Sequence, residues 1–210
     1  VTSVVIPNSV KYIRSDAFLD CTNLTAVHIT DLAKWCNISF SSNTSNPLYY
    51  AKKLYLNGVE IKDLIIPNNV KAILLRTFKC LDLTSVTIPN SVTSIGNEAF
   101  DGCSGLTSVN IGNGVKSIGN YAFRNCAELT DVYCYAENVP STQSYAFADS
   151  YIEYATLHVP AASIEQYKAT APWSNFGAIV ATDEDAIAEV QAVPVLIQTQ
   201  GNTITVEGAE

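Results

Sequence analysis

The two histidines are the first side chains to consider, because imidazole can transfer protons or bind a metal ion near neutral pH. They are His28 and His158. Both occupy outward positions in strands of a repeating pattern, five units apart, which at roughly 5 Å per strand separates them by about 25 Å. At that distance they cannot share a metal ion or a proton relay. We expect two separate, solvated imidazoles on the surface.

The six cysteines could form disulfides or bind zinc. Four of them, Cys21, Cys80, Cys103 and Cys126, recur behind a phenylalanine and are assigned to one column of the repeat. There is no Cys-x-x-Cys pair and no neighbouring histidine pair, so zinc is not expected. Neighbours in the column could come close enough to form a disulfide, but a repeated small apolar position explains them better. We predict a ladder of buried free thiols, and Cys134 in a strand position of the core.

No motif for catalysis or cofactor binding is present. Neither histidine is tied to a nucleophile on a sharp turn, and the phosphate-binding patterns G-x-G-x-x-G and G-x-x-x-x-G-K-[ST] are absent. The segment Gly112-Asn113-Gly114 stands where a neighbouring unit has Pro-Asn-Ser, so we interpret it as a turn of the repeat. The sequence therefore predicts no catalytic residue, no metal site and no cofactor, and a protein that is not an enzyme.

The composition excludes several classes of partner. The chain has 210 residues with 12 Lys and Arg against 20 Asp and Glu, a formal net charge of −8. Such an acidic chain is not expected to bind nucleic acid or an anionic membrane surface. No apolar run approaches the roughly 18 residues of a membrane span. Because the chain contains no Met, we expect it to be a piece of a longer or processed protein, with any signal peptide outside it.

The elements that position these residues are set by an internal repeat. Residues 83–103 and 106–126 match at a period of 23 residues, and weaker copies begin near residues 1, 61, 129 and 154. In the unit at 83–103, Val86 and Ile88 alternate with polar residues as in a strand, and Pro89 ends that strand. Ile95 and Phe100 then return to the interior. One unit cannot enclose its own apolar groups, so consecutive units must stack on a continuous core.

The unit at 83–103, L-T-S-V-x-I-P-N-S-V-x-x-I-G-x-x-A-F-x-x-C, resembles the BspA-like leucine-rich repeat family of bacterial cell-surface proteins of the Bacteroidetes type. The resemblance covers roughly residues 1–180. It implies an α/β-type repeat solenoid, a right-handed leucine-rich repeat coil with one parallel β-sheet and short helical or turn segments opposite. Residues 30–60 depart from the pattern, and the unit at 129–153 lacks the I-P-N-S segment.

The departures define the expected domain organisation. Residues 1–180 form a solenoid of about seven units, with an enlarged unit at 24–60 that bulges outward and contains a β-hairpin insertion around Asn57-Gly58. Residues 161–180 carry clustered aromatic residues and are expected to cap the last coil. Residues 181–210 are expected to form an acidic linker and the start of a truncated C-terminal β-module.

The outer face of the sheet is the candidate binding surface. Its predicted residues are those that alternate with the buried strand positions, namely Val5, His28, Asp63, Ile65, Thr87, Asn110, Asp131, Tyr133 and His158. In proteins with leucine-rich repeats this face is the usual docking surface. Most of its positions here are small and polar, which favours a shallow and extended contact.

Three functions remain open at this point. The first is a secreted or cell-surface module for adhesion, which the resemblance implies, with an unidentified host extracellular protein or glycan as partner. The second is a purely structural stalk that presents a neighbouring domain. The third and most remote is a hydrolase with a cleft at the 30–60 insertion, which would need a pair of carboxylates about 5–10 Å apart.

Overall fold

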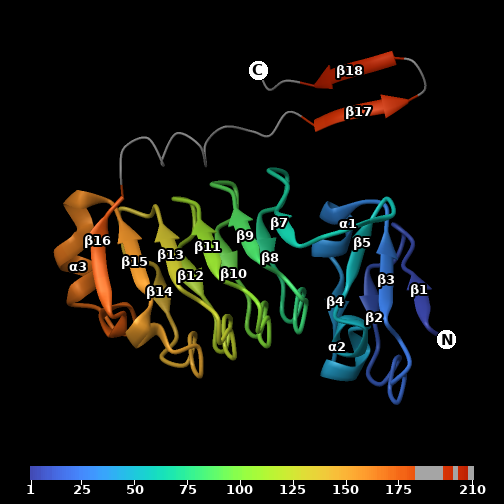
Figure 1. Ribbon diagram of the computed structural model, residues 1–210, viewed down its shortest axis with the longest axis horizontal. Coiled ribbons are helices and arrows are strands. Elements are labelled where there is room, and N and C mark those ends of the chain that lie inside the picture. Colours follow the sequence, from blue (N-terminus) through green and yellow to red (C-terminus); the bar gives the residue numbers. More distant parts are fainter. Residues whose placement is uncertain (183–195, 201–202, 208–210) are drawn as a thin grey trace.

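The chain winds into a solenoid over its first 182 residues. The computed structural model describes residues 1–182, 196–200 and 203–207. Each coil of the solenoid adds one strand to a sheet along one side (Figure 1). The longer part of this sheet has six parallel strands, in the order β16 (Ala178–Ala181), β15 (Thr156–Val159), β13 (Asp131–Cys134), β11 (Ser108–Ile111), β9 (Ser85–Ile88) and β7 (Asp63–Ile65). Neighbouring strands are one coil apart in the sequence, which confirms the predicted repeat solenoid.

The register of the sheet follows the 23-residue period from β9 to β13. Val86 lies beside Val109, and Val109 lies beside Val132, so equivalent residues stack on one another. Within each strand the Val and Ile side chains are buried, and the small polar side chains between them are half-buried. The alternation therefore turns one face of the sheet to the core and the other toward solvent.

A second column of strands lies farther along each coil. It consists of the short parallel strands β8 (Ala72–Ile73), β10 (Ser94–Ile95), β12 (Ser117–Ile118) and β14 (Ser141–Thr142). The prediction of a single parallel sheet is therefore wrong. The second sheet forms because Ile73, Ile95 and Ile118 stack in register, so each coil can hydrogen-bond to the next at this point as well.

The first sheet is interrupted between β5 and β7, where the short strand β6 pairs with β5 alone. Its N-terminal part has the order β1 (Ser3–Val5), β3 (Ala26–Ile29), β5 (Leu54–Leu56) and β6 (Val59–Glu60). β6 runs antiparallel to β5 across Asn57 and Gly58, which both have positive φ. β5 also pairs with β3, so this segment is part of the sheet and the predicted hairpin insertion is not seen as a separate lobe. Leu54 and Leu64 are the core residues of β5 and β7. The segment between them is too short to form a full coil of the solenoid.

The second coil is longer than the regular coils and contributes large side chains to the core. Between β3 and β5 the chain forms α1 (Leu32–Cys36), β4 (Ser39–Phe40), η1 (Asn43–Ser45) and α2 (Leu48–Ala51). β4 pairs with β2 (Tyr12–Ile13) of the first coil, and Trp35, Phe40 and Leu48 are buried. These large apolar side chains fill the coil from inside, so the extra residues enlarge the core.

Side chains of the second coil join the two parts of the solenoid. The indole Nε1 of Trp35 donates to the carbonyl oxygen of Thr77 at 3.1 Å. The amide Nδ2 of Asn46 donates to the carbonyl oxygen of Arg76 at 2.7 Å. Both donors are buried, and both acceptors belong to the next coil. These bonds connect the two parts across the place where β5 and β7 do not pair.

Each regular coil closes in a turn with two positive-φ residues, four positions apart. In one coil these are Glu98 (φ 54°) and Gly102 (φ 78°), and in the preceding coil the second position is Cys80 (φ 61°). Cys80 therefore does not belong to the thiol column of Cys103, contrary to the prediction. The preceding unit is one residue shorter, and the buried Leu81 occupies the place of the thiol.

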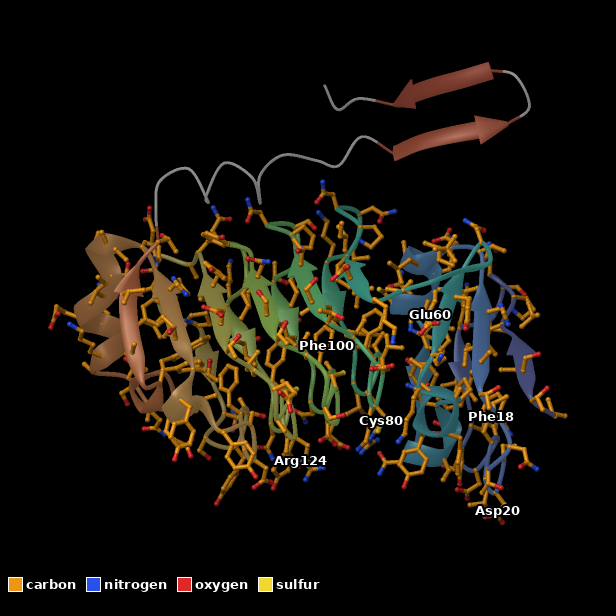
Figure 2. The ribbon with its side chains drawn as sticks, in the orientation of Figure 1. Phe18, Asp20, Glu60, Cys80, Phe100 and Arg124 are labelled. Carbon is orange, nitrogen blue, oxygen red and sulfur yellow. The ribbon has the colours of Figure 1, made fainter. Side chains whose placement is uncertain are left out.

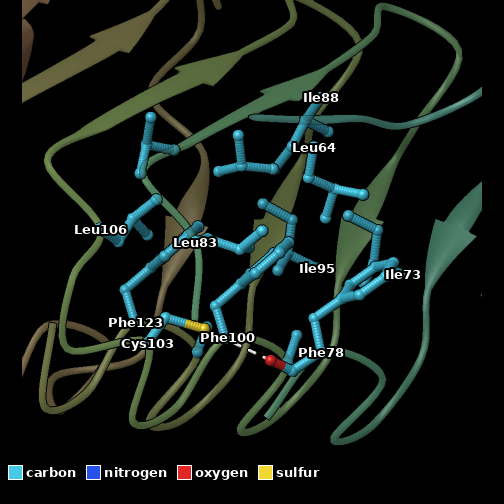
Figure 3. Close-up of a cluster of buried hydrophobic side chains, with 14 of the residues drawn as sticks. Leu64, Ile73, Phe78, Leu83, Ile88, Ile95, Phe100, Cys103, Leu106 and Phe123 are labelled. Atoms are coloured by element: carbon cyan, nitrogen blue, oxygen red, sulfur yellow. Dashed lines mark hydrogen bonds between the residues drawn. The ribbon is translucent and has the colours of Figure 1, made fainter. Parts of the chain in front are cut away.

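The core is a stack of equivalent side chains from consecutive coils (Figure 3). Phe78, Phe100, Phe123 and Phe147 are buried, and successive ring centroids are 5.5, 5.2 and 5.5 Å apart. Their planes differ by 13°, 3° and 8°, so the rings are stacked. The Sγ of Cys103 lies beside this stack and contacts the carbonyl oxygen of Phe78 at 3.3 Å.

Aromatic residues cover the end of this stack. After η2 (Ile152–Tyr154) and β15, the chain forms η3 (Ala161–Ser163), α3 (Ile164–Lys168) and η4 (Trp173–Asn175). The rings of Trp173 and Phe176 meet the ring of Phe147 edge-on, with centroid distances of 5.5 and 5.4 Å. Tyr167 packs in turn on Trp173 at 5.4 Å. Phe147, the last ring of the stack, is therefore shielded from solvent.

The C-terminal region is described in part. β17 (Leu196–Gln200) and β18 (Thr203–Glu207) pair with each other in antiparallel register. The predicted acidic linker, from residue 183 onward, lies outside the described residues. The division of the chain at residue 180, and the truncated β-module after it, remain predictions.

Candidate functional site

The nine predicted binding residues all lie at outward positions of the first sheet. They are Val5 in β1, His28 in β3, Asp63 and Ile65 in β7, Thr87 in β9, Asn110 in β11, Asp131 and Tyr133 in β13, and His158 in β15. The structure does not bring all nine together. The interruption after β5 separates Val5 and His28 from the other seven, which share the six-stranded part.

One line of outward side chains crosses the six-stranded part without a gap. We call it the outer row, and its members, each beside the next in register, are Ile65, Thr87, Asn110, Tyr133, His158 and Val180. At about 4.8 Å per strand the row is roughly 24 Å long. Val180 was not predicted, because β16 lies beyond the regular repeats. Its exposed side chain extends the row by one position.

The most ordered part of the outer row surrounds His158. Its ring stacks on the ring of Tyr133, with a centroid distance of 4.1 Å and an interplanar angle of 11°. Its Nε2 lies 2.9 Å from Oδ1 of Asp131. The side chain of His158 is 20% exposed, so it is not the freely solvated imidazole expected from the sequence. The stacked phenol ring and the carboxylate fix its orientation.

A second histidine and tyrosine pair lies in the N-terminal part of the sheet. The rings of His28 and Tyr55 stack with centroids 4.9 Å apart, and the hydroxyl of Tyr55 donates to Oε2 of Glu60 at 3.1 Å. Tyr55 was not predicted as a surface position, because its segment was interpreted as an inserted hairpin. The available signal was the Leu-Tyr-Leu alternation at 54–56, which matches the Val-x-Ile of the other strands.

The large apolar groups of this surface are few and separated. Ile65 is 49% exposed at one end of the outer row, and the Tyr133 and His158 pair lies toward the other end. Thr87 and Asn110 lie between them and are half-buried. A partner could therefore approach the centre of the row closely and find larger anchors at both ends.

The turn side of the solenoid carries a cluster of charges that was not predicted (Figure 2). The Nζ of Lys79, a side chain 6% exposed, lies 2.6 Å from Glu98 and 2.8 Å from Asp101. Arg124 donates to both oxygens of Asp101 at 2.9 and 2.8 Å, and Arg76 donates to Glu98 at 2.7 Å. The signal in the sequence is that residues of opposite charge recur about one period apart, as Asp101 and Arg124 do.

The ionised forms of these groups stabilise one another. Burial raises the pKa of Asp101, but hydrogen bonds from Arg124 and Lys79 outweigh it, so the pKa of Asp101 is lowered. In the same way burial is outweighed by Arg76 and Lys79 at Glu98, whose pKa is also lowered. The pKa of Lys79 is raised, because its two carboxylate partners outweigh its burial. The cluster therefore links three consecutive coils as a structural network.

The cysteines are free, as predicted. Cys36, Cys103, Cys126 and Cys134 are buried, and Cys21 and Cys80 are partly buried. Burial raises the pKa of Cys36 to about 12 and that of Cys134 to about 11. Such thiols remain protonated and unreactive near neutral pH. In the part of the chain that the structure describes, no three His, Cys, Asp or Glu side chains gather as a metal site.

The carboxylates near the interruption do not support hydrolysis. Glu60 and Asp63 line an open groove of about 320 Å³. Burial raises the pKa of Glu60, but hydrogen bonds from Lys62 and Tyr55 outweigh it and its pKa is lowered. Asp63 accepts a hydrogen bond from the hydroxyl of Ser85 at 2.6 Å. A general acid needs a raised pKa, whereas the pKa of Glu60 is lowered, so Glu60 does not fit the acid role that the remote hydrolase alternative requires.

Comparison with known families gives one clear match. The family described as "BspA type Leucine rich repeat region" matches residues 1–51 and 49–169, with six copies of the repeat. These ranges cover most of the solenoid. No curated protein sequence matches the chain.

Several solved structures are similar. A leucine-rich repeat protein from Eubacterium ventriosum has a TM-score of 0.50 and 20% identity, over 86% of this chain and 48% of that one. The leucine-rich repeat protein of T. pallidum has a TM-score of 0.41 and 26% identity, over 63% of this chain and 58% of that one. The pneumococcal vaccine antigen PcpA has a TM-score of 0.41 and 13% identity, over 87% and 68%. The first similarity shows the fold, and the chain spans only about half the length of the first two proteins.

Proposed function

The chain belongs to the BspA-type leucine-rich repeat family, and from that premise we propose that it is a non-enzymatic module that binds a protein partner through the outer face of its sheet. The observation that carries this proposal is the outer row, an unbroken line of in-register side chains. The strands beneath it are paired on both sides from β9 to β15. The side chains are therefore held at fixed spacing before a partner arrives, which lowers the entropic cost of binding.

The ends of the outer row supply the contacts that favour affinity. Aromatic side chains with restricted rotamers are typical binding hot spots, and Tyr133 is held by its stack on His158. Ile65 offers an exposed apolar group at the other end. Between these anchors the surface is polar and small, which suits a long contact of moderate affinity that becomes tight when many copies act together.

We infer a location outside the cell, secreted or on the cell surface, with a host extracellular protein as partner. The family resemblance to surface proteins supports this location. No helix among the described residues is long and apolar enough to cross a bilayer. The net charge of −8 disfavours nucleic acid and anionic membranes as partners.

Surface plasmon resonance tests this proposal with the full chain and immobilised collagen, laminin and fibronectin as representative matrix proteins. We expect saturable binding to at least one of them, weakened about tenfold or more by Tyr133→Ala and by Ile65→Asp. The matched control is Tyr145→Ala, which removes a tyrosine that is 59% exposed on the turn side. Equal effects of Tyr133→Ala and Tyr145→Ala would contradict binding through the outer face.

The alternative is a structural stalk that holds a neighbouring domain away from the cell. The small side chains in the centre of the outer row, Thr87 and Asn110, favour it, because they offer little contact area. A stalk requires no ligand, so the isolated chain would show no saturable binding to any of the three matrix proteins. That result would favour the stalk over the binding module.

A further inference from the structure

A groove of about 680 Å³ opens at one edge of the six-stranded part, where its central strands end. One wall is the loop between β11 and β12, which contributes Asn113 and Lys116. The opposite wall is the loop between β13 and β14, residues 135–140. Pro160, which follows β15, also lines the groove. The groove lies at the ends of the strands, so it is distinct from the outer row.

The groove exists because one coil departs from the repeat. Six residues separate β13 from β14, whereas five separate β11 from β12 and five separate β9 from β10. In the regular coils the Oδ1 of Asn90 accepts a hydrogen bond from the backbone N–H of Asn113 at 2.9 Å. The corresponding N–H, that of Ala136, forms no such bond to the side chain of Asn113 in the part of the chain that the structure describes. The bond between Asn90 and Asn113 is therefore not repeated in the next coil, whose loop keeps backbone hydrogen bonds to the preceding coil only at its two ends, from Tyr135 to Ile111 and from Ser141 to Lys116.

The irregular loop is nevertheless held in place from behind. Three side chains of the segment between β15 and β16 donate to its carbonyl oxygens, namely Tyr167 to Ala136 at 2.8 Å, Ser163 to Glu137 at 2.7 Å and Trp173 to Pro140 at 3.4 Å. All three donor residues are buried. Residues that shield the last coil thus also fix one wall of the groove. Such a wall is preorganised and needs little ordering when a ligand binds.

The groove combines a polar rim with an apolar floor. The rim side chains of Asn113, Lys116, Glu137 and Asn138 are exposed, and within the described residues they form no hydrogen bond or ion pair. The floor consists of more buried groups, namely Val115, Tyr135, Val139 and Pro140. The rim therefore has unused amide, ammonium and carboxylate groups above a surface that water wets poorly.

We propose that this groove binds a short neutral oligosaccharide of two or three sugar units. Sugar hydroxyls donate and accept hydrogen bonds, as the amides of Asn113 and Asn138 do, and the C–H face of a sugar ring suits an apolar floor. Lys116 and Glu137 contribute one positive and one negative charge, so these two rim groups give no net charge that would favour an anion or a cation. The volume lies within the range of about 300–1,000 Å³ that is usual for small-ligand sites. This site goes beyond the proposed function and does not depend on it.

The test is a titration of the ¹⁵N-labelled full chain with maltotriose, cellotriose and N,N′,N″-triacetylchitotriose, followed by amide chemical shifts. We expect at least one trisaccharide to cause saturable shifts of Asn113, Lys116 and Asn138 at concentrations up to about 10 mM. Asn113→Ala and Asn138→Ala should each weaken binding by about fivefold, the effect of one lost hydrogen bond. These side chains make no other contact by hydrogen bond, so both variants should fold normally.

The matched control is Asn68→Ala. Asn68 occupies the same repeat position as Asn113, is exposed, and lies outside the groove. It should leave the trisaccharide affinity unchanged, and so should Ile65→Asp on the outer row. The proposal is overturned if none of the three sugars shifts the groove amides, if the shifts fall on the outer row instead, or if Asn68→Ala weakens binding as much as Asn113→Ala. Shifts caused only by a tetraproline peptide would identify a peptide groove and also overturn it.

Discussion

Phe100 is the residue at which one repeated position can be tested most simply. Its ring is fully buried between the rings of Phe78 and Phe123. Phe100→Ala should lower the free energy of unfolding by about 3–5 kcal/mol, because it leaves a cavity in a packed stack. Urea unfolding followed by circular dichroism measures this change, with the exposed Tyr145→Ala as control. A loss below about 1 kcal/mol would mean that the column is not buried.

The cysteines offer a second test at the residue scale. Burial keeps Cys36, Cys103, Cys126 and Cys134 protonated, whereas Cys21 and Cys80 are partly accessible. Titration of the folded protein with a thiol reagent at pH 8 should therefore label at most these two quickly, and all six after denaturant is added. Rapid labelling of four or more cysteines in the folded protein would contradict the buried positions.

Individual positions were predictable where the repeat is regular. Val86, Ile95 and Phe100 are buried as expected, because alternation and period both point to the same face. Cys80 was misplaced because a unit one residue short shifts the apparent column, and only the backbone pairing reveals the shift. The environment of His158 could not be predicted, since the two neighbours that hold it lie 25 and 27 residues earlier, in the preceding coil.

At the scale of the element, the charge cluster should make the free energy of unfolding depend on pH in the acidic range. The folded-state pKa of Asp101 and of Glu98 lies below the ordinary value, so their stabilisation is present above the unfolded pKa of about 4 and is lost as pH falls through the folded pKa. We expect the free energy of unfolding to fall as the pH is lowered below about 4. Urea unfolding measured between about pH 2 and pH 7 gives this dependence.

Asp101→Asn isolates the cluster in that experiment. It should destabilise the protein at pH 7 by about 3–5 kcal/mol, because Lys79 is left buried with one carboxylate partner fewer. The variant should also show a smaller decline in the free energy of unfolding as the pH is lowered. Asp149→Asn is the control, since Asp149 is exposed and forms no ion pair among the described residues. An unchanged acid dependence in Asp101→Asn would show that the network does not contribute.

The elements themselves were predictable to different degrees. The strand with its Val-x-Ile pattern was clear, because apolar alternation is strong there. The second column of strands was not predicted. Each of its strands has only two residues, which is too few to show the apolar alternation of a strand. Residues 30–60 were expected to bulge, because repeat spacing is lost; the structure shows that Trp35 and Leu48 are buried and replace the regular core positions.

At the scale of the whole molecule, the interruption after β5 predicts a weak point in cooperativity. Asn46 and Trp35 carry hydrogen bonds between the two parts. Asn46→Ala removes a buried amide donor and leaves a carbonyl oxygen of the next coil without this partner. We expect the free energy of unfolding to fall by about 1–3 kcal/mol, and the N-terminal part to unfold first. In a Trp173→Phe background, Trp35 is the remaining tryptophan and reports on that part alone.

Comparison of tryptophan fluorescence with circular dichroism measures this uncoupling. In the Trp173→Phe background the two urea transitions should coincide, and Asn46→Ala should move the fluorescence transition to lower urea. Asn37→Ala is the control, because its amide donates to Ala33 within the same coil. Coincident transitions in Asn46→Ala would mean that other contacts couple the two parts.

The central claim is that consecutive coils stack in parallel with equivalent residues in register, at a spacing of 23 residues from β9 to β13, which creates the outer row and sets the irregular coil apart. Cross-strand nuclear Overhauser effects between amide and Hα protons test it most directly. The account predicts contacts that connect Val86 with Val109 and Val109 with Val132, in a parallel pattern, and none between β5 and β7. Contacts in an antiparallel pattern, or displaced by one residue from this register, would contradict it.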